Sequence, residues 1–276
     1  MLAAVLIATS GRRTRLLANR SLRSVYTMNA VDPAEVQVVV VDDNADRAEL
    51  KHVAVEIEHL RRRIGLRAED YPTTLIRNAR TVGHSGTGAW NTGLDWLRSR
   101  SNPRAWIALL DDDDEFLPRH MANCLGAAGD GVVGIFERLE WVRTNGIEQR
   151  PFSVDDLTPQ AFFVGNPGVQ GSNLFVRLDA LSAIGGFDES LPNTTDRDLM
   201  IRLLRHASRS KQIVCVLPTI GVRYYDHDEP RVNTDVRRKH QGLDLFYAKH
   251  AQDFSQADLD ASLARSRTLF GYQRNQ

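Results

Sequence analysis

The sequence has 276 residues, with 35 Lys and Arg against 35 Asp and Glu, which gives a formal net charge of zero at pH 7. This balance excludes the strongly basic surface of a general nucleic-acid binder. The hydrophobic content of 42% argues against wholesale disorder. The two cysteines, Cys124 and Cys215, lack metal-ligand spacing, which excludes a disulfide framework and a cysteine zinc cluster. We interpret both as buried thiols.

The first eight residues form an apolar run of the kind that also occurs in signal peptides. This run lacks a cationic start and continues directly into Thr9 and Arg12, so a buried strand over Ala4–Ala8 is the better interpretation. No apolar run approaches the roughly 20 residues that span a bilayer. We therefore expect a cytoplasmic protein without a transmembrane segment.

The N-terminal half alternates apolar strands with amphipathic helices. We predict strands over 4–8, 36–41, 73–77 and 106–110, and helices over 16–25, about 45–63 and 89–98. Val36–Val41 is an almost continuous β-branched run, typical of a strand buried on both faces. This alternation predicts a parallel sheet with helices on both faces and right-handed crossovers.

The pattern becomes mixed beyond residue 130. We predict strands over 131–139, 149–154, 172–177, 213–217 and 220–225, short helices over 159–164 and 179–184, and an amphipathic helix over 195–206. From residue 235 onward the chain is helical and charged. Because neither a repeat nor a linker divides the sequence, we expect one domain with a helical tail.

An acidic run, Asp111–Glu115, directly follows the predicted strand 106–110. Carboxylates packed this tightly repel one another, and a bound divalent cation relieves the repulsion; oxygen ligands favour Mg²⁺ or Mn²⁺. Such a cation would bridge the phosphates of a nucleotide substrate. The alternative is a solvated charge run, although its position at a strand end argues against that.

A second acidic strand end, Asp42–Asn44, follows the valine-rich strand. A carboxylate there can accept hydrogen bonds from a ribose hydroxyl or a base, or it can cap the next helix, and the residues alone do not separate these possibilities. Ligands on parallel sheets bind at the carboxyl ends of the strands. Thr9, Asp42 and Asp111 all fall there.

Two later segments carry further candidate groups. Thr195 and Asp196 precede an apolar helical stretch, where they either cap the helix or supply a carboxylate that takes a proton from an attacking nucleophile. His227 follows a strand. A solitary histidine is commonly structural, but beside an acidic metal site it becomes a candidate nitrogen ligand.

Taken in order, these motifs resemble those of family 2 glycosyltransferases of the GT-A fold, over about residues 3–232. The matching segments are Asp42–Asn44 with the VDD element, Leu109–Pro118 with the strand-end DxD motif, Gly185–Glu189 with GGFDE, and Thr195–Leu199 with (E)D-x-D-L. The resemblance implies an α/β GT-A fold with a Rossmann-like, mostly parallel central sheet flanked by helices, a smaller mixed acceptor-side region and a helical C-terminal tail.

The resemblance also divides the chain. Residues 1–232 correspond to the glycosyltransferase domain, in which 1–118 form the nucleotide-sugar-binding half and 119–232 the acceptor and catalytic half. Residues 233–276 form a helical extension. Loops such as Gly165–Asn173 would border the acceptor, unless this segment is a plain turn. Independently of the resemblance, the charge of Tyr225–Asn233 and its Pro230 suggest the hypothesis that this segment closes over the diphosphate as a lid.

Each site residue receives a role from the same resemblance. Asp196 matches the catalytic base of inverting members, and Asp113 and His227 match metal ligands for Mn²⁺ or Mg²⁺. The residues matching nucleotide-sugar contacts are Thr9, Gly11, Asp42, Asp43, Arg80, Asp111 and Asp112. Four consecutive aspartates leave the register of the metal ligands open.

The sequence departs from the family pattern at three positions. Trp90 stands where members often carry Arg before the Asn of that helix, and Thr195 replaces the usual Glu before the base. Gly11 occupies a position where an aromatic residue often packs on the base. None of these changes removes a catalytic group.

The implied activity is metal-dependent, inverting transfer of a sugar from a nucleotide diphosphate donor, a UDP-sugar, to an acceptor hydroxyl on a small molecule, glycan, lipid-linked molecule or peptide. One alternative is a nucleotidyltransferase of related fold, since Thr9–Arg13 faintly resembles a phosphate-binding loop. Another is a non-catalytic sugar-nucleotide-binding module, against which Asp111, Asp113 and Asp196 argue.

Overall fold

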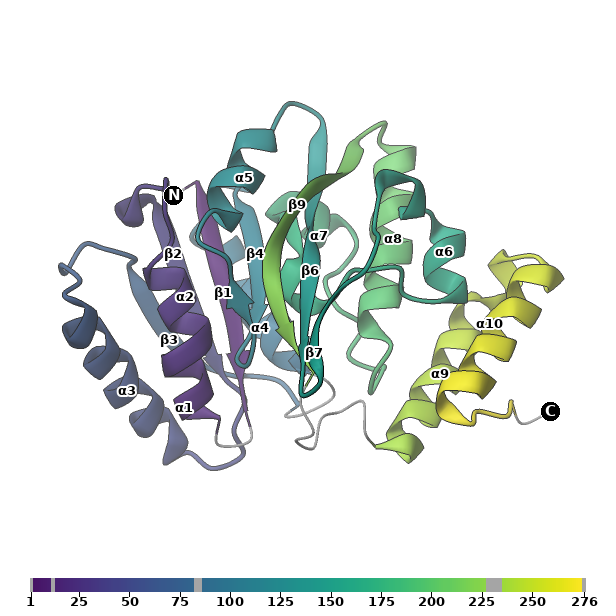
Figure 1. The fold of residues 1–276 in the computed structure, drawn as a ribbon, viewed down its shortest axis with the longest axis horizontal. Coiled ribbons are helices and arrows are strands. Elements are labelled where there is room, and N and C mark those ends of the chain that lie inside the picture. The colour runs from purple at the N-terminus through teal and green to yellow at the C-terminus, as the bar shows by residue number, and fades with distance from the viewer. Residues whose placement is uncertain (1, 11–12, 82–85, 227–234, 275–276) are drawn as a thin grey trace.

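The computed structural model describes residues 2–10, 13–81, 86–226 and 235–274. Strands of the described chain join one sheet in the order β3-β2-β1-β4-β8-β6-β9-β5, with β7 paired to β6 (Figure 1). Their bounds are β1 Ala3–Thr9, β2 Val36–Asp42, β3 Thr73–Arg77, β4 Trp106–Asp111, β5 Glu115–Phe116, β6 Val132–Arg143, β7 Gly146–Gln149, β8 Phe175–Arg177 and β9 Ile213–Tyr225. Strands β1 to β4 pair in parallel, whereas β8 runs antiparallel to β4 and β6.

Helices connect these strands and cover the sheet. Their bounds are α1 Thr14–Leu16, α2 Leu22–Tyr26, α3 Glu49–Ile64, α4 Thr87–Arg98, α5 His120–Ala127, α6 Pro159–Val164, α7 Leu178–Ala183, α8 Thr195–Arg209, α9 Val236–His250 and α10 Gln256–Phe270. A π-helical turn, Leu17–Ser21, joins α1 to α2. Among the described helices, none combines the length and the hydrophobicity that a membrane-spanning segment requires.

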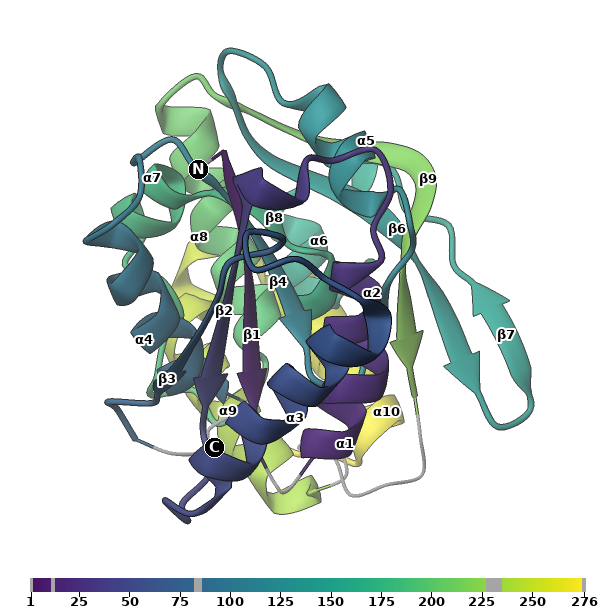
Figure 2. The ribbon, with the colours of Figure 1, turned by 90° about the vertical axis from the view of Figure 1, so that its left-hand side faces the viewer.

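Alternating side chains of the parallel strands enter two separate cores. In β2, Val39 and Val41 belong to the core beneath α4 and α8, while Val38 and Val40 belong to the core beneath α2 and α3. Figure 2 shows α4 and α7 on one side of β1 and β2, with α2 and α3 on the other. The prediction of a parallel sheet covered on both faces is confirmed.

Close helix–strand packing needs a glycine in α4. A Cβ added to Gly93 would lie 2.2 Å from Cδ1 of Leu6, so only a residue without a side chain lets α4 approach β1. This approach fixes the start of α4, and with it Trp90, beside the carboxyl end of β1.

Several predicted boundaries are corrected. Residues 150–154 are not a strand, because β7 forms a short hairpin with β6 and ends at Gln149. The predicted strands 213–217 and 220–225 are one strand, β9, whose pairing with β6 shifts register near Pro218, a residue without a backbone N–H. The helix after β2 begins at Glu49 rather than about Ala45. Cys215 is only half-buried, whereas Cys124 is buried as expected.

The C-terminal helices pack against the second half of the sheet domain (Figure 1). Phe163 of α6 stacks on Phe254 with ring centroids 4.1 Å apart and on Phe246 of α9 at 5.8 Å. Phe246 and Tyr247 are buried in the same core as residues of β1 and α4. The predicted helical tail is therefore helical, and its apolar side chains complete one of the two cores.

Candidate active site

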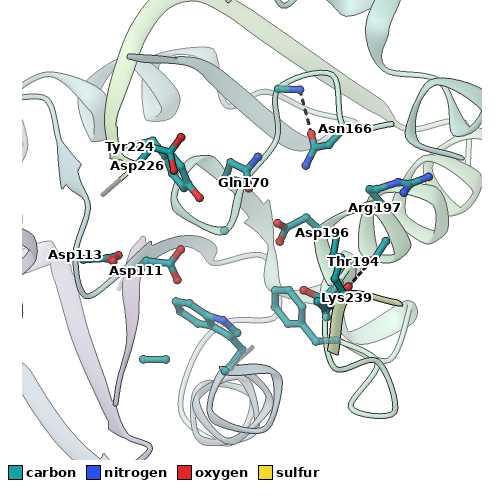
Figure 3. A pocket seen from close by; sticks show the side chains of 18 of the residues that line it. Asp111, Asp113, Asn166, Gln170, Thr194, Asp196, Arg197, Tyr224, Asp226 and Lys239 are labelled. Carbon is teal, nitrogen blue, oxygen red and sulfur yellow. Dashed lines mark hydrogen bonds between the residues drawn. The ribbon is translucent and has the colours of Figure 1, made fainter. Parts of the chain in front are cut away.

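A pocket of about 600 Å³ opens at the carboxyl ends of β1, β2 and β4. Asp43 and Asp111 line it from the sheet, Asp196 from the first turn of α8, and Lys239 from α9. Figure 3 shows the Asp196 carboxylate directed into the pocket, between Asp111 and Asp113 on one side and Lys239 on the other. Segments far apart in the sequence thus meet in one cavity.

The aspartates after β4 separate into different environments. Asp111 and Asp113 line the pocket. Asp112 lines it too but turns toward β1, where its carboxylate accepts hydrogen bonds from Thr9 Oγ1 at 2.8 Å and the Ser10 amide at 3.2 Å. Burial and the adjacent charge of Asp113 raise the pKa of Asp112 to about 7. Thr9, which the sequence predicted to contact the nucleotide, is not among the described residues that line the pocket. Its hydroxyl instead holds the Asp112 carboxylate in place.

The residues present fit a divalent cation. Carboxylate oxygens of Asp111, Asp113 and Asp114 lie within 4.8 Å of one another, and hard oxygen donors of this kind suit Mn²⁺ or Mg²⁺. Asp114 is fully buried, accepting hydrogen bonds from Ser172 Oγ and, at 2.9 Å, from the Tyr225 amide. Burial and the charges of Asp113 and Asp111 raise the Asp114 pKa well above its ordinary value. Asp114 is thus a ligand candidate that the sequence left ambiguous.

Basic side chains partly balance this acidic cluster. Arg13 NH1 lies 3.2 Å from Asp113 Oδ2 and 3.4 Å from Asp112 Oδ1. Arg20 donates a 2.7 Å hydrogen bond to the Asp113 carbonyl, and its guanidinium lies 3.7 Å from the ring centre of Tyr225. These contacts hold the turn after β4 against the first helical segment.

The two aspartates that end β2 differ in position. Asp42 is fully buried and accepts hydrogen bonds from Asn44 Nδ2 at 2.6 Å and Arg77 NH1 at 3.3 Å, so its carboxylate stabilises the turn. Asp43 lines the pocket, and Asn78 donates a 2.5 Å hydrogen bond to its Oδ1. A nucleotide contact of Asp43 stays a prediction that this geometry permits.

Arg80 belongs to an ion-pair network and is not one of the described residues that line the pocket. Its guanidinium donates to Asp95 at 2.5 Å and to Glu189 of the Gly-Gly-Phe-Asp-Glu segment. Asn91 also donates to Glu189, at 2.7 Å, and to the Phe187 carbonyl at 2.9 Å. The network fixes that segment to α4. A contact of Arg80 with the nucleotide remains a prediction.

Asp196 occupies the second position of α8 and does not cap it. The N-cap is Thr194, in the left-handed conformation at φ 67°, and its side chain makes no capping hydrogen bond. Burial and the charge of Asp111 raise the Asp196 pKa to about 7, while the charge of Lys239 opposes the rise. A carboxylate in this environment can accept a proton near neutral pH.

The neighbouring residues of the Thr-Asp-Arg-Asp segment hold α8 to other helices. Arg197 is buried and donates to the Phe162 and Phe163 carbonyls. Asp198 accepts hydrogen bonds from His250 at 2.8 Å and Lys249 at 2.6 Å. Burial of Asp198 would raise the pKa of its carboxyl group. The hydrogen bonds from His250 and Lys249, together with a further hydrogen bond and the charge of Arg202, outweigh this effect and hold the pKa well below its usual range.

The sequence missed several residues that line the pocket. Arg238, Lys239 and Arg265 come from α9 and α10, which showed only as a charged tail. The glycine-rich segment 165–173 also borders the pocket, and a Cβ at Gly171 would lie 3.3 Å from Asp111 Oδ2. Two predicted residues, Gly11 and His227, lie outside the described residues, as does most of the predicted lid.

The comparisons with known proteins agree with this architecture. Residues 7–184 match the sequence profile of glycosyl transferase family 2, whereas no curated protein matches the chain. The fold is similar to TarS 1–349 of S. aureus in complex with UDP-GlcNAc, with a TM-score of 0.68 and 14% identity over 98% of this chain and 73% of that one. It is also similar to the mannosyltransferase PcManGT of Pyrobaculum calidifontis in complex with GDP-Man and Mn²⁺, with a TM-score of 0.61 and 15% identity over 97% and 75% of the two chains.

These similarities are of two kinds. At such low identity the solved structures establish the GT-A fold alone. The profile match covers more than half of the 276 residues and includes the acidic run after β4. The chain therefore belongs to glycosyl transferase family 2 and is a glycosyltransferase of the GT-A fold.

Proposed function

We propose that the protein transfers a sugar from a nucleotide diphosphate donor to an acceptor hydroxyl, with inversion, and that Asp196 is the general base. One observation carries this proposal: the Asp111–Asp113 cluster and the Asp196 carboxylate face the same pocket from opposite sides (Figure 3). A donor bound at the acidic side and an acceptor bound near Asp196 would place their reacting atoms between them.

The donor side is supported by the acidic cluster and by the ligands of similar folds. TarS 1–349 was solved with UDP-GlcNAc and PcManGT with GDP-Man and Mn²⁺. We infer a UDP-sugar for this chain, with Asp43 and Asp111 toward the nucleoside and ribose. Asp113, with Asp111 and Asp114, would hold Mn²⁺ or Mg²⁺. When bound, the cation supplies positive charge to the departing diphosphate.

The position of Asp196 supports the proposed acceptor side. Its carboxylate removes the proton from the acceptor hydroxyl while that oxygen bonds to the anomeric carbon. The bond from this carbon to the diphosphate breaks, and the diphosphate keeps the electron pair. Because the attack comes from the face opposite the leaving group, the anomeric configuration inverts.

We also propose that residues 1–118 form the donor-binding half and 119–232 the acceptor and catalytic half. Asp43 and Asp111 come from the first part, and Asp196 from the second. Residues from 233 onward add α9 and α10, which supply Lys239 and Arg265 to the same pocket. A shortened chain ending near residue 232 would therefore lack part of the pocket wall.

The test is a screen of nucleotide sugars with Mn²⁺, measuring nucleoside diphosphate released without an added acceptor. We expect slow hydrolysis of one donor, with water replacing the acceptor. Asp113→Asn should abolish the release because it removes a carboxylate of the acidic cluster, whereas Asp260→Asn on the exposed face of α10 should not. If no nucleotide sugar binds or is cleaved under any metal condition, the proposal is wrong.

A further inference from the structure

The two ends of the pocket carry opposite charge. Asp43, Asp111 and Asp113 line one end, and the cationic residues of α9 and α10, Arg238, Lys239 and Arg265, line the other. In Figure 3 Lys239 lies on the far side of Asp196 from Asp111 and Asp113. The proposed base therefore stands at the boundary between an acidic and a basic region.

The basic end lacks carboxylate partners within the described chain. No ion pair there includes Arg238, Lys239 or Arg265, although Arg150 on the pocket rim is paired with Glu148 at 2.9 Å. The adjacent Arg197 is buried, yet the groups it bonds are the Phe162 and Phe163 carbonyls and Ser262, all uncharged. The negative charge of Asp196 attracts the Lys239 ammonium and acts to raise the pKa of Lys239.

These cations repel one another at close range. Burial and the charge of Arg197 lower the pKa of Lys239 to about 8. Burial also lowers the pKa of Arg197 to about 10, with a further contribution from the charge of Arg265. Asp196 is the acidic residue that opposes the shift of Lys239, so a ligand that supplies negative charge would offset part of the remaining repulsion.

We propose that the basic end binds an oxyanion carried by the acceptor, a phosphate or a carboxylate close to the hydroxyl that Asp196 deprotonates. Lys239 acts as a point charge, and the Arg265 guanidinium offers a planar fork that matches such a group. The Arg265 guanidinium lies against the glycine-rich segment that borders the pocket, since a Cβ on Gly165 would lie 2.6 Å from Arg265 Nε. The inference rests on the proposed function and adds the chemical class of its acceptor.

Two other uses of the basic end make opposite predictions. If the cations instead neutralised the diphosphate of the donor, removing them would weaken nucleoside diphosphate binding. If Lys239 served only as a counter-ion for Asp196, the pocket would not prefer an anionic ligand over its neutral analogue. Binding measurements on separate probes distinguish these cases.

The experiment titrates metal-free protein in EDTA with glycerol, glycerol 3-phosphate and glycerate, by calorimetry or NMR. We expect the two anions to bind at least tenfold more tightly than glycerol, and the stronger anion to identify phosphate or carboxylate. The double variant Lys239→Gln and Arg265→Gln should lose this preference. The matched control, Arg237→Gln with Arg267→Gln, removes exposed cations from the same two helices outside the described pocket lining and should keep it.

Two results would overturn the proposal. One is equal affinity, or no detectable binding, for all three probes in the wild-type protein. The other is a loss of UDP–Mn²⁺ affinity in the Lys239 and Arg265 double variant as large as its loss of anion affinity. Normal donor hydrolysis together with either result would reject the acceptor class and leave the proposed glycosyl transfer intact.

Discussion

His250 Nε2 on α9 lies 2.8 Å from Oδ1 of Asp198 on α8, two residues beyond Asp196. Lys249 Nζ lies 2.6 Å from the same oxygen, and both partners belong to the C-terminal segment. The bond therefore fixes the first turn of α8, which carries the proposed base, to the helix that carries Lys239. The C-terminal helices are part of the pocket rather than an independent appendage.

Replacing Asp198 should destabilise the protein because its charged partners would remain in a buried site. We expect Asp198→Ala to lower the free energy of unfolding by about 3 kcal/mol, measured by urea denaturation. Asp253→Ala is the matched control, since Asp253 pairs with Arg205 on the surface and should change stability by less than about 1 kcal/mol. Equal losses in the two variants would contradict the linking role of Asp198.

Replacing Asp196 should separate chemistry from donor binding. Asp196→Asn keeps the size of the side chain but cannot take a proton, so we expect transfer to fall by about 10³-fold. UDP–Mn²⁺ affinity, measured by calorimetry, should remain within about twofold of the wild-type value, since the proposed donor site is on the opposite wall of the pocket. Preserved turnover would exclude Asp196 as the base.

The pH dependence of the transfer rate should reflect the ionisation of Asp196. Burial and Asp111 raise the pKa of Asp196 to about 7, and a base works only when deprotonated. The transfer rate at low substrate concentration should therefore rise as pH increases from about 6 to about 8, the range in which Asp196 loses its proton before Lys239, with a pKa of about 8, loses its charge. A profile that is flat between pH 5 and 9 would contradict this assignment.

Stability should show the opposite pH trend at this position. A raised pKa means that the folded state binds the proton more tightly than the unfolded chain, whose ordinary value is 3.8. The stabilisation that protonated Asp196 gives is present below about pH 4 and is lost as pH rises through about 7. Asp196→Asn should match the wild-type protein at pH 4 and exceed its stability by ~4 kcal/mol at pH 8. Denaturation of the metal-free protein at both pH values checks this.

Neighbouring aspartates should differ in their effect on metal binding. Asp113→Asn removes a carboxylate from the cluster with Asp111 and Asp114, so Mn²⁺ affinity should fall by about tenfold or more. Asp112→Asn alters a side chain that bonds Thr9 and Ser10 and should keep affinity within a few-fold. Electron paramagnetic resonance of free Mn²⁺ measures both. A larger loss of Mn²⁺ affinity for Asp112→Asn than for Asp113→Asn would assign the metal ligand to Asp112 instead of Asp113.

Much of the architecture was predictable from local sequence. The valine run of β2 has no polar face, so it requires cover on both sides, and acidic runs directly after strands must lie at the carboxyl edge of a parallel sheet. These features place Asp43, Asp111 and Asp113 in one region without knowledge of the loops. The strands of the second half were less predictable, because their pairing with distant segments and the register shift near Pro218 set their ends.

What the sequence by itself determined is the alternation of strands and helices, the acidic strand ends and the family motifs, since hydrophobic periodicity and strand-end position act over short distances. Only the tertiary structure decided that Asp112 accepts a hydrogen bond from Thr9, that Asp198 bonds His250, and that Lys239 lines the same pocket as Asp196. These relationships join segments separated by tens of residues. They depend on how the helices pack, which no local pattern encodes.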